Sequence, residues 1–275
     1  MSPSDTAKKK ILITGAAGKV GTLISRHLHG QYDLCLTDIQ KPVQLSDCDF
    51  HQADICDYTA FRPLCNGVHT IVHLAAIADE NSPWEPLLQN NIIGLYNVFE
   101  AAADAGCRRV IFASSIYAVH GYPKDVLVHT DMPVRPLTLY GTTKVFGEAL
   151  GSFYAYQRNL PAICLRLGWV LESKNRHMTM NNLSLDTVIT YDDVIRLFNA
   201  AIEVSENIRF GIFHGLSNNR RKRLDIQDTI DIINYHPQDD AFKLAQANTL
   251  NKKPRRLSDI TISRLVNYIK KRFLH

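Results

Sequence analysis

The sequence lacks the features that mark membrane, secreted and metal-dependent proteins. Its 275 residues contain six cysteines, and no two of them form a C-x-x-C pair. They predict reduced thiols in a cytoplasmic protein, with neither a disulfide framework nor a metal site. No apolar run approaches the roughly 20 residues that span a membrane. The stretch 1–10 is polar and basic without an apolar core, so we expect no secretory signal and no membrane partner.

The excess of positive charge is small and lies at the end of the chain. The net charge is +4, and the stretch 220–275 holds the basic clusters 220–223 and 252–256. No aromatic residues alternate with these clusters, as they would in a platform that stacks nucleotide bases. We therefore interpret them as a solvated basic edge and expect no nucleic-acid partner.

A glycine turn near the start is the most informative stretch. The apolar run 11–13 predicts a buried strand, and Gly15, Gly18 and Gly21 follow it before a helical pattern begins. This is the context of a dinucleotide-binding fingerprint, here spaced G-x-x-G-x-x-G. Gly15 allows the tight turn, Gly18 lets the backbone approach a pyrophosphate, and Gly21 lets the helix pack on the sheet. The helix N-terminus then attracts the phosphates.

An acidic residue ends the second predicted strand. The run 32–37 leads into Asp38, near the usual spacing of about 20 residues from the glycines. Its carboxylate is placed to accept hydrogen bonds from the adenosine ribose of NAD and to repel the 2′-phosphate of NADP. The sequence therefore predicts NAD as the cofactor.

Strands and helices alternate along the rest of the chain. The stretch 169–190 is expected to be irregular and 225–275 to form short helices, while a long loop after Ser115 is expected to be functional. The alternation predicts an α/β fold with a Rossmann-type, doubly wound parallel sheet. The expected strands are 50–55, 70–76, 109–113, 163–168 and 209–215, and the expected helices are 83–105, 140–158 and 191–203.

Ser115, Tyr140 and Lys144 are the candidate catalytic residues. Tyr140 and Lys144 are four residues apart and so lie on one helical face. Tyr140, as phenolate, would take the proton of a substrate hydroxyl, and Lys144 together with an oxidised nicotinamide would lower its pKa from the usual value near 10. Ser115 would hydrogen-bond the substrate oxygen while hydride passes to the cofactor. His73, inside a predicted strand, is interpreted as a core residue.

The chain resembles the extended short-chain dehydrogenase/reductases, the superfamily of NAD-dependent epimerases and dehydratases. Within that superfamily it is most similar to the uronate (hexuronate) dehydrogenases. The similarity covers most of the chain up to about residue 245, and it rests on the stretches 14–21, 83–85, 91–102, 112–115, 140–144, 191–193, 215–219 and 235–241.

The resemblance implies a role for individual residues. Tyr140 and Lys144 would be catalytic, with Ser115 assisting. The residues that would contact NAD are Gly15, Ala17, Gly18, Lys19, Val20, Asp38, Ile39, Asp54, Ile55, Leu74, Ala75, Ala76, Asn91, Ser114, Tyr140 and Lys144. Those that would contact the substrate are Ala78, Ser115, Ile116, Tyr117, Tyr140 and Arg176.

The substrate half departs from the pattern of the resembled enzymes. Where uronate dehydrogenases read Ser-Ser-Asn-His after the fifth strand, Ile116 and Tyr117 replace the last two residues. Where they read Gly-Gly-Ile-Ser, Ala78 replaces the serine, and their carboxylate-binding arginine corresponds only loosely to Arg176. We therefore expect glucuronate and galacturonate to be poor substrates and a neutral aldose or a smaller sugar acid to be preferred.

These features predict an NAD-dependent oxidoreductase of uronate-dehydrogenase type, which oxidises a sugar or sugar acid at its anomeric hydroxyl to a lactone. Two alternatives remain open: a nucleotide-sugar epimerase or dehydratase with tightly bound NAD, and a non-catalytic NAD-binding sensor. The short C-terminal half disfavours a pocket for a large nucleotide, and a sensor needs no catalytic Tyr140. The expected organisation is an NAD-binding domain over 1–168 and a small C-terminal substrate-binding lobe over 169–275, interleaved into effectively one domain.

The predicted helices 83–105 and 140–158 carry apolar residues over more than one stripe. Phe146, Leu150, Phe153 and Tyr154 would then need cover. Contact between two copies through these helices would provide it, and the resemblance implies the same arrangement. We therefore expect a homodimer.

Overall fold

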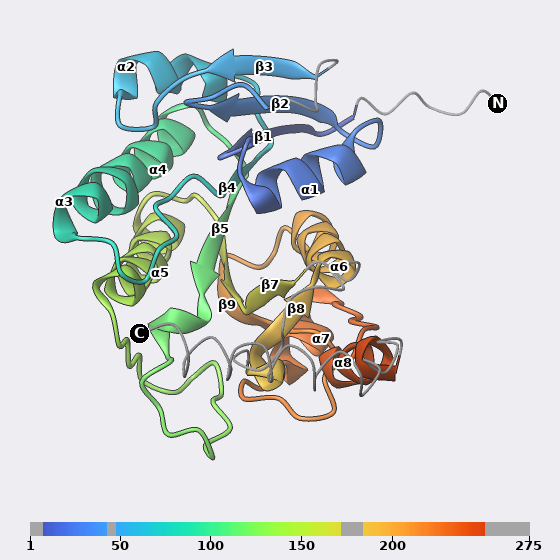
Figure 1. The fold of residues 1–275 in the computed structure, drawn as a ribbon. Coiled ribbons are helices and arrows are strands. Elements are labelled where there is room, and N and C mark those ends of the chain that lie inside the picture. Colours follow the sequence, from blue (N-terminus) through green and yellow to red (C-terminus); the bar gives the residue numbers. More distant parts are fainter. Residues whose placement is uncertain (1–7, 43–47, 172–183, 251–275) are drawn as a thin grey trace, which may run out of the picture.

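A seven-stranded parallel sheet forms the centre of the molecule (Figure 1). The computed structural model describes residues 8–42, 48–171 and 184–250. The strands lie in the order β3-β2-β1-β4-β5-β6-β9, so the expected doubly wound sheet is confirmed. They are β1 (Lys10–Thr14), β2 (Asp33–Asp38), β3 (Asp49–Gln52), β4 (Thr70–His73), β5 (Arg109–Ser115), β6 (Ala162–Leu167) and β9 (Phe210–Gly215).

Helices cover both faces of this sheet, which is why its central strands are apolar along their whole length. On one face α1 (Lys19–Leu28) and α6 (Tyr191–Glu203) pack against side chains such as Ile11 and Ile13. On the other, α2 (Tyr58–Phe61), α4 (Leu95–Asp104) and α5 (Leu139–Gln157) pack against Leu12 and Ile71. The strand order reverses between β1 and β4, and ligands of such sheets bind at the carboxyl ends beside that point.

The expected helix 83–105 contains an unpredicted π-helical segment. The chain runs from α3 (Trp84–Leu87) through a π-helix at Leu88–Gly94 into α4 without a break. The buried Asn91 lies in this segment. π-helical turns insert one extra residue and often occur at functional sites, and apolar spacing alone does not reveal them.

The chain from residue 169 onward, called the lobe below, contains a two-stranded parallel sheet. The expectation of an irregular stretch over 169–190 is wrong at both ends, because β7 (Trp169–Leu171) pairs with β8 (Val188–Thr190). Strands of three residues are too short to show a period of two. Helices α7 (Gln227–Ile233) and α8 (Ala241–Leu250) follow, as the prediction of short helices requires. β9 joins β6 in the main sheet, so the chain beyond residue 169 completes the first half's sheet.

Two arginines of the basic cluster 220–223 make contacts with other parts of the chain. Nε of Arg220 lies 3.0 Å from an Asp240 carboxylate oxygen. The guanidinium of the buried Arg223 donates to the carbonyl oxygens of His120 and Tyr122, which ties the loop after β5 to the lobe. The cluster 252–256 lies outside the described residues. Within the part of the chain that the structure describes, no helix has the length and apolar character to cross a membrane.

Candidate active site

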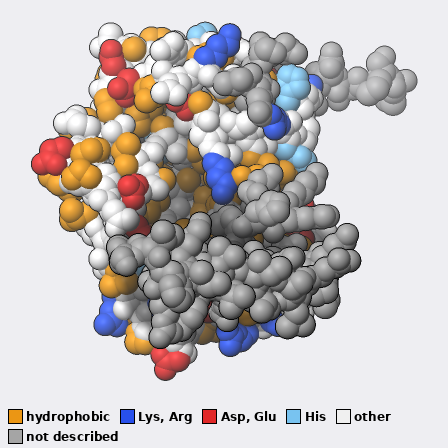
Figure 2. Space-filling model, in the orientation of Figure 1, with side chains coloured by type: hydrophobic (Ala, Val, Ile, Leu, Met, Phe, Trp, Pro, Cys, Tyr) orange, Lys and Arg blue, Asp and Glu red, His pale blue; other side chains and the backbone are white. Residues whose placement is uncertain are grey.

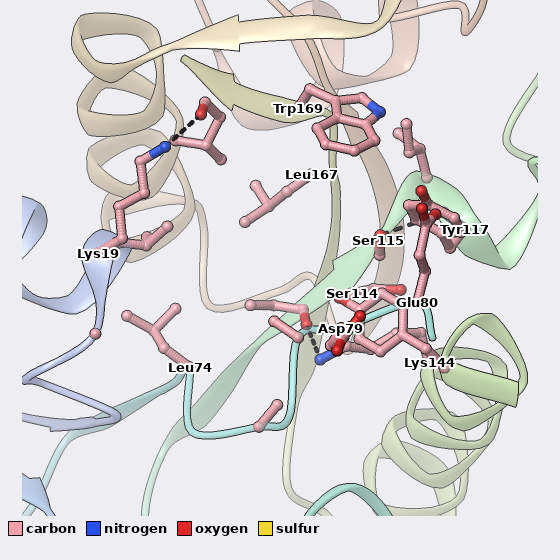
Figure 3. A pocket seen from close by; sticks show the side chains of 18 of the residues that line it. Lys19, Leu74, Asp79, Glu80, Ser114, Ser115, Tyr117, Lys144, Leu167 and Trp169 are labelled. Atoms are coloured by element: carbon pink, nitrogen blue, oxygen red, sulfur yellow. Dashed lines mark hydrogen bonds between the residues drawn. The ribbon is translucent and has the colours of Figure 1, made fainter. Parts of the chain in front are cut away.

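A pocket of about 570 Å³ opens at the carboxyl ends of β1, β4, β5 and β6 (Figure 3). The glycine turn lines one side of it, and the end of β5, the start of α5 and β7 line the other. Of the residues expected in the site, those that line it are Gly15, Gly18, Lys19, Val20, Leu74, Ala76, Ala78, Ser114, Ser115, Ile116, Tyr117, Tyr140 and Lys144.

The glycine turn has the geometry that a dinucleotide needs. Gly15 has a φ of +69°, and a Cβ there would lie 2.6 Å from the backbone nitrogen of Ala75. A Cβ on Gly21 would lie 2.1 Å from the carbonyl oxygen of Gly15, so helix and turn are in direct backbone contact. Gly18 stands at the N-terminal cap of α1 and lines the pocket. The residues therefore fit a pyrophosphate held against the free N–H groups of the helix.

Asp38 lies beside this turn at the end of β2. Its Oδ2 accepts a hydrogen bond of 2.9 Å from the backbone N–H of Ala17, and its Oδ1 accepts one of 3.2 Å from Gln40. The carboxylate therefore braces the turn and remains half-buried at the position where a ribose would follow the pyrophosphate.

Several expected NAD contacts lie outside the pocket lining. Ile39 is exposed, Asp54 accepts a hydrogen bond from the N–H of Cys56, and Ile55 is buried against Gly94. Asn91 uses its amide to hold the loop after β4. Its Oδ1 accepts from the N–H of Ile77 at 2.8 Å, and its Nδ2 donates to the Ile77 carbonyl at 3.0 Å. In this structure Asn91 thus positions the loop that carries Ala78.

The three candidate catalytic residues, Ser115, Tyr140 and Lys144, all line the pocket; Figure 3 labels Ser115 and Lys144. Ser115 is the last residue of β5, and Thr138 caps α5 so that Tyr140 stands in its first turn. Lys144 follows one turn later. Its Nζ donates to the carbonyl oxygen of Ala113 at 2.9 Å and lies 5.6 Å from the centre of the Tyr140 ring.

Burial shifts the pKa of both ionisable members of this group. It raises the pKa of Tyr140, and a hydrogen bond with Ser115 opposes that rise. It lowers the pKa of Lys144 to about 8, and the charge of Glu148 opposes that fall. The expected lowering of the Tyr140 pKa by Lys144 is not found, because burial is the largest effect on the phenol and the opposing contact is the hydrogen bond with Ser115.

His73 is a core residue, as expected. It is buried, hydrogen-bonded to the Thr14 hydroxyl at 2.8 Å and stacked on Phe112. Burial and the nearby Lys144 lower its pKa to about 3, so it is neutral at physiological pH.

An aromatic and acidic wall faces the catalytic residues. The Tyr117 ring lies 5.7 Å from the Tyr140 ring and 6.3 Å from the Trp169 ring, measured between centres. Asp79 and Glu80 line the same pocket from the loop after β4. Ile116, expected to contact substrate, also packs into the lobe's apolar cluster. Arg176 lies outside the described residues.

Sequence reasoning missed Trp169, Asp79 and Glu80. Trp169 follows the end of β6, so the rule that ligands bind at the carboxyl ends of parallel strands would have indicated it. The two acids carry no such signal, because a loop acid is ordinarily a solvated surface group. Lys19 also has an unpredicted contact: its Nζ donates to the Val170 carbonyl at 2.7 Å and joins α1 to β7.

A second group of potential ligands lies away from the pocket. Atoms of Cys35, Asp49 and His51, on β2 and β3, lie within 4.8 Å of one another. Burial raises the pKa of the Cys35 thiol to about 11, which disfavours the thiolate that binds metals. The His51 ring is 3.0 Å from an Asp49 carboxylate oxygen. We therefore assign this group no metal.

The comparison with protein families decides the class. Residues 11–233 match the NAD dependent epimerase/dehydratase family. The chain belongs to this family.

Similar proteins include two sugar dehydrogenases of Haloferax volcanii. One, an NAD-dependent glucose-6-phosphate dehydrogenase, is 32% identical over 84% of this chain and 94% of its own. The other, an L-arabinose 1-dehydrogenase (NAD(P)(+)), is 29% identical over 86% of this chain and 99% of its own. A mutant uronate dehydrogenase from Agrobacterium tumefaciens, solved with NAD, is 30% identical with a TM-score of 0.78, over 91% of this chain and 92% of its own.

Proposed function

We propose that this chain is an NAD-dependent sugar dehydrogenase that oxidises the anomeric hydroxyl of its substrate and releases a lactone. The observation that carries the proposal is the convergence of Ser115, Tyr140 and Lys144 on a pocket that the glycine turn also lines. The similar proteins support it, because all three are named as sugar or sugar-acid dehydrogenases.

Separate residues of the pocket would bind the cofactor and carry out the reaction. The turn at Gly15 and Gly18 would hold the pyrophosphate of NAD, and Asp38 its adenosine ribose. NAD, when bound, supplies the hydride acceptor. Tyr140 would take the proton of the anomeric hydroxyl, and Ser115 would hold the same oxygen in place. The ammonium of Lys144 would stabilise the phenolate as it forms.

A neutral sugar is the substrate class that this pocket favours. Asp79 and Glu80 would add negative charge at the sugar end and so weakly disfavour a carboxylate or a phosphate there, since solvent screens part of the charge of these exposed side chains. Lys19 donates to the Val170 carbonyl and Lys144 to that of Ala113, so neither ammonium points freely at a substrate anion. The rings of Tyr117 and Trp169 offer apolar faces to the sugar ring.

The departures from the uronate dehydrogenases also favour a neutral sugar over a uronate. A polar group of a uronate that is buried against Ala78 or Ile116 loses a hydrogen-bond partner, which costs about 1–3 kcal/mol for each group. Tyr117 would return one such bond. We assign substrate binding to the lobe that begins at residue 169 together with the loop after β5.

Two further proposals concern the whole protein. We propose a homodimer formed by α3, α4 and α5, supported by the exposed aromatic side chains on these helices. We propose a cytoplasmic location, supported by six cysteines that form no disulfide.

The deciding experiment is a substrate panel. Purified protein is assayed for NADH formation with uronates, aldohexoses, aldopentoses and sugar 6-phosphates, and the product is tested for a lactone. We expect the highest kcat/KM with a neutral sugar. A kcat/KM for glucuronate more than about tenfold above that for every neutral sugar would contradict the proposal of a neutral substrate. If none of these sugars yields NADH and the protein converts a nucleotide sugar, it is an epimerase or dehydratase instead.

A further inference from the structure

A buried charge network lies behind the catalytic lysine. Glu148 stands one helical turn beyond Lys144 on α5, and both it and Arg166 of β6 are almost completely buried. Arg166 donates two parallel hydrogen bonds to the carboxylate, Nε to Oε1 at 2.8 Å and Nη2 to Oε2 at 2.9 Å. The hydroxyl of Ser114 donates to the same Oε1 at 2.6 Å. The carboxylate is therefore held in one orientation.

The network continues to His214 on β9. Nη1 of Arg166 donates to Nε2 of His214 at 3.3 Å, and Nδ1 of His214 donates to the Asp225 carbonyl at 2.7 Å. Burial and the charge of Arg166 lower the pKa of His214 to about 4, so its ring is neutral and Nε2 can accept. Arg166 is thus held by Glu148 on one side and by His214 on the other, which fixes the orientation of its guanidinium toward Glu148.

Among the described groups near Lys144, Glu148 is the buried carboxylate. His73 is neutral, and Asp79 and Glu80 are exposed to solvent, which screens their charge. The groups that face Lys144 or the pocket around it are Tyr140 and Glu148 from α5, His73 from β4, the Ala113 carbonyl from β5, and Asp79 and Glu80 from the loop after β4.

We propose that Glu148 is a positioning residue for catalysis: clamped by Arg166 and Ser114, it keeps Lys144 protonated where water is excluded. The inference rests on the proposed dehydrogenase function, in which the ammonium of Lys144 stabilises the Tyr140 phenolate. A buried ammonium without a nearby anion loses its proton readily. Without the Glu148 charge, Lys144 would lose its proton at lower pH, and the unpaired Arg166 would push in the same direction.

The test is the pH profile of kcat/KM in Glu148→Gln. Its matched control is Glu203→Gln, because Glu203 forms an ion pair with Lys9 outside the pocket. The alkaline limb of the profile reports loss of the Lys144 proton. We expect it to move toward lower pH by about one to two units in Glu148→Gln and to stay in place in Glu203→Gln. An unmoved limb in a folded Glu148→Gln protein overturns the proposal.

A second variant covers the case in which the first does not fold, because removing one partner of a buried ion pair is strongly destabilising. The double variant Glu148→Gln with Arg166→Met removes both charges, an exchange that buried pairs often tolerate. We expect the same limb to move in the same direction but by less than in Glu148→Gln, because Arg166 no longer repels the Lys144 ammonium. A folded double variant with the wild-type limb overturns the proposal.

A readout that needs no turnover separates this inference from the proposed function. In protein labelled at lysine, the ε-carbon NMR signal of Lys144 is assigned by its absence in Lys144→Met, and its titration is followed with pH. We expect the midpoint to fall in Glu148→Gln. A lower midpoint in a protein that oxidises no sugar supports the inference and contradicts the proposed function. An unchanged midpoint alongside sugar turnover contradicts the inference alone.

Discussion

At the residue scale, the candidate site places two ionisable groups where their charged forms are disfavoured. Burial raises the pKa of Tyr140 and lowers that of Lys144, whereas the proposed reaction needs a phenolate and an ammonium. Ser115 opposes the first shift and Glu148 the second. The site therefore depends on those two contacts, and on the charge of a bound cofactor, to bring the pair into its working state.

Tyr140→Phe should reduce kcat by about 10²- to 10⁴-fold, the usual contribution of a general acid or base. It removes the phenolic oxygen and keeps the ring that packs against Tyr117. Binding of NAD, followed by calorimetry, should stay close to wild type. Tyr122→Phe is the control, since the Tyr122 hydroxyl donates to the Pro133 carbonyl and its ring is outside the pocket lining. A Tyr140→Phe enzyme with most of its rate would remove Tyr140 from the mechanism.

Lys144→Met should stabilise the protein at neutral pH. The pKa of Lys144 is lowered to about 8 in the folded state, whereas an unfolded lysine titrates near 10.4. The unfolded chain thus binds more protons between these values, and wild-type stability gains from this group as pH rises through that window. Below it, the variant should be more stable by about 2–3 kcal/mol. Urea unfolding at neutral pH and near pH 10 measures the free energy of unfolding of the wild type and of the variant. If the variant's extra stability does not shrink at alkaline pH, this account is contradicted.

At the scale of elements, the carboxyl ends of β1 and β2 set the choice of cofactor. Asp38 ends β2 and its carboxylate already accepts a hydrogen bond from the turn after β1. A 2′-phosphate there would meet a carboxylate that the turn holds in place. Sequence and geometry thus support the same cofactor.

The protein should use NAD in preference to NADP. We expect kcat/KM to be higher with NAD than with NADP. The variant Asp38→Ser should lower the ratio of these two values, because it removes the charge that repels the 2′-phosphate. Asp33→Ser is the matched control, since Asp33 is an exposed aspartate at the opposite end of β2. Equal efficiency with both cofactors in the wild type would contradict the prediction.

The sequence predicted those parts of the site that are local in the chain. The glycine turn, Asp38, and the pair Tyr140 and Lys144 each occupy a short stretch whose spacing carries the geometry. The ion pair between Glu148 and Arg166 joins α5 to β6, and one sequence does not show that these two side chains meet. The π-helical segment was likewise hidden, because it changes the hydrogen bonds and leaves the apolar spacing helical.

At the scale of the whole molecule, one surface remains apolar. Figure 2 shows hydrophobic side chains gathered over α3 and α4. Trp84, Tyr96, Phe153 and Tyr156, from α3, α4 and α5, are each exposed by two fifths or more. Tyr154, which we expected to need cover, is already buried within the chain. Exposed apolar side chains that gather on one surface are typical of an interface.

Phe153→Glu should convert the expected dimer into a monomer, because a charge would be buried against the partner helices. Light scattering at micromolar concentration gives the mass of each form. Leu127→Glu, an exposed residue in the loop after β5, is the control and should leave the mass unchanged. A monomeric wild-type protein would contradict the proposal that the exposed side chains of α3, α4 and α5 form a dimer interface.

The position of β9 also bears on how the chain is made. This strand is separated from its partner β6 by the whole of β7, β8 and α6, and it brings His214 to the guanidinium of Arg166. A growing chain that has not yet released residue 215 from the ribosome therefore has an uncovered edge beside β6 and an arginine without one of its acceptors. The sheet is therefore complete only after residue 215 has left the ribosome, and until then the uncovered edge of β6 is open to pairing with other chains.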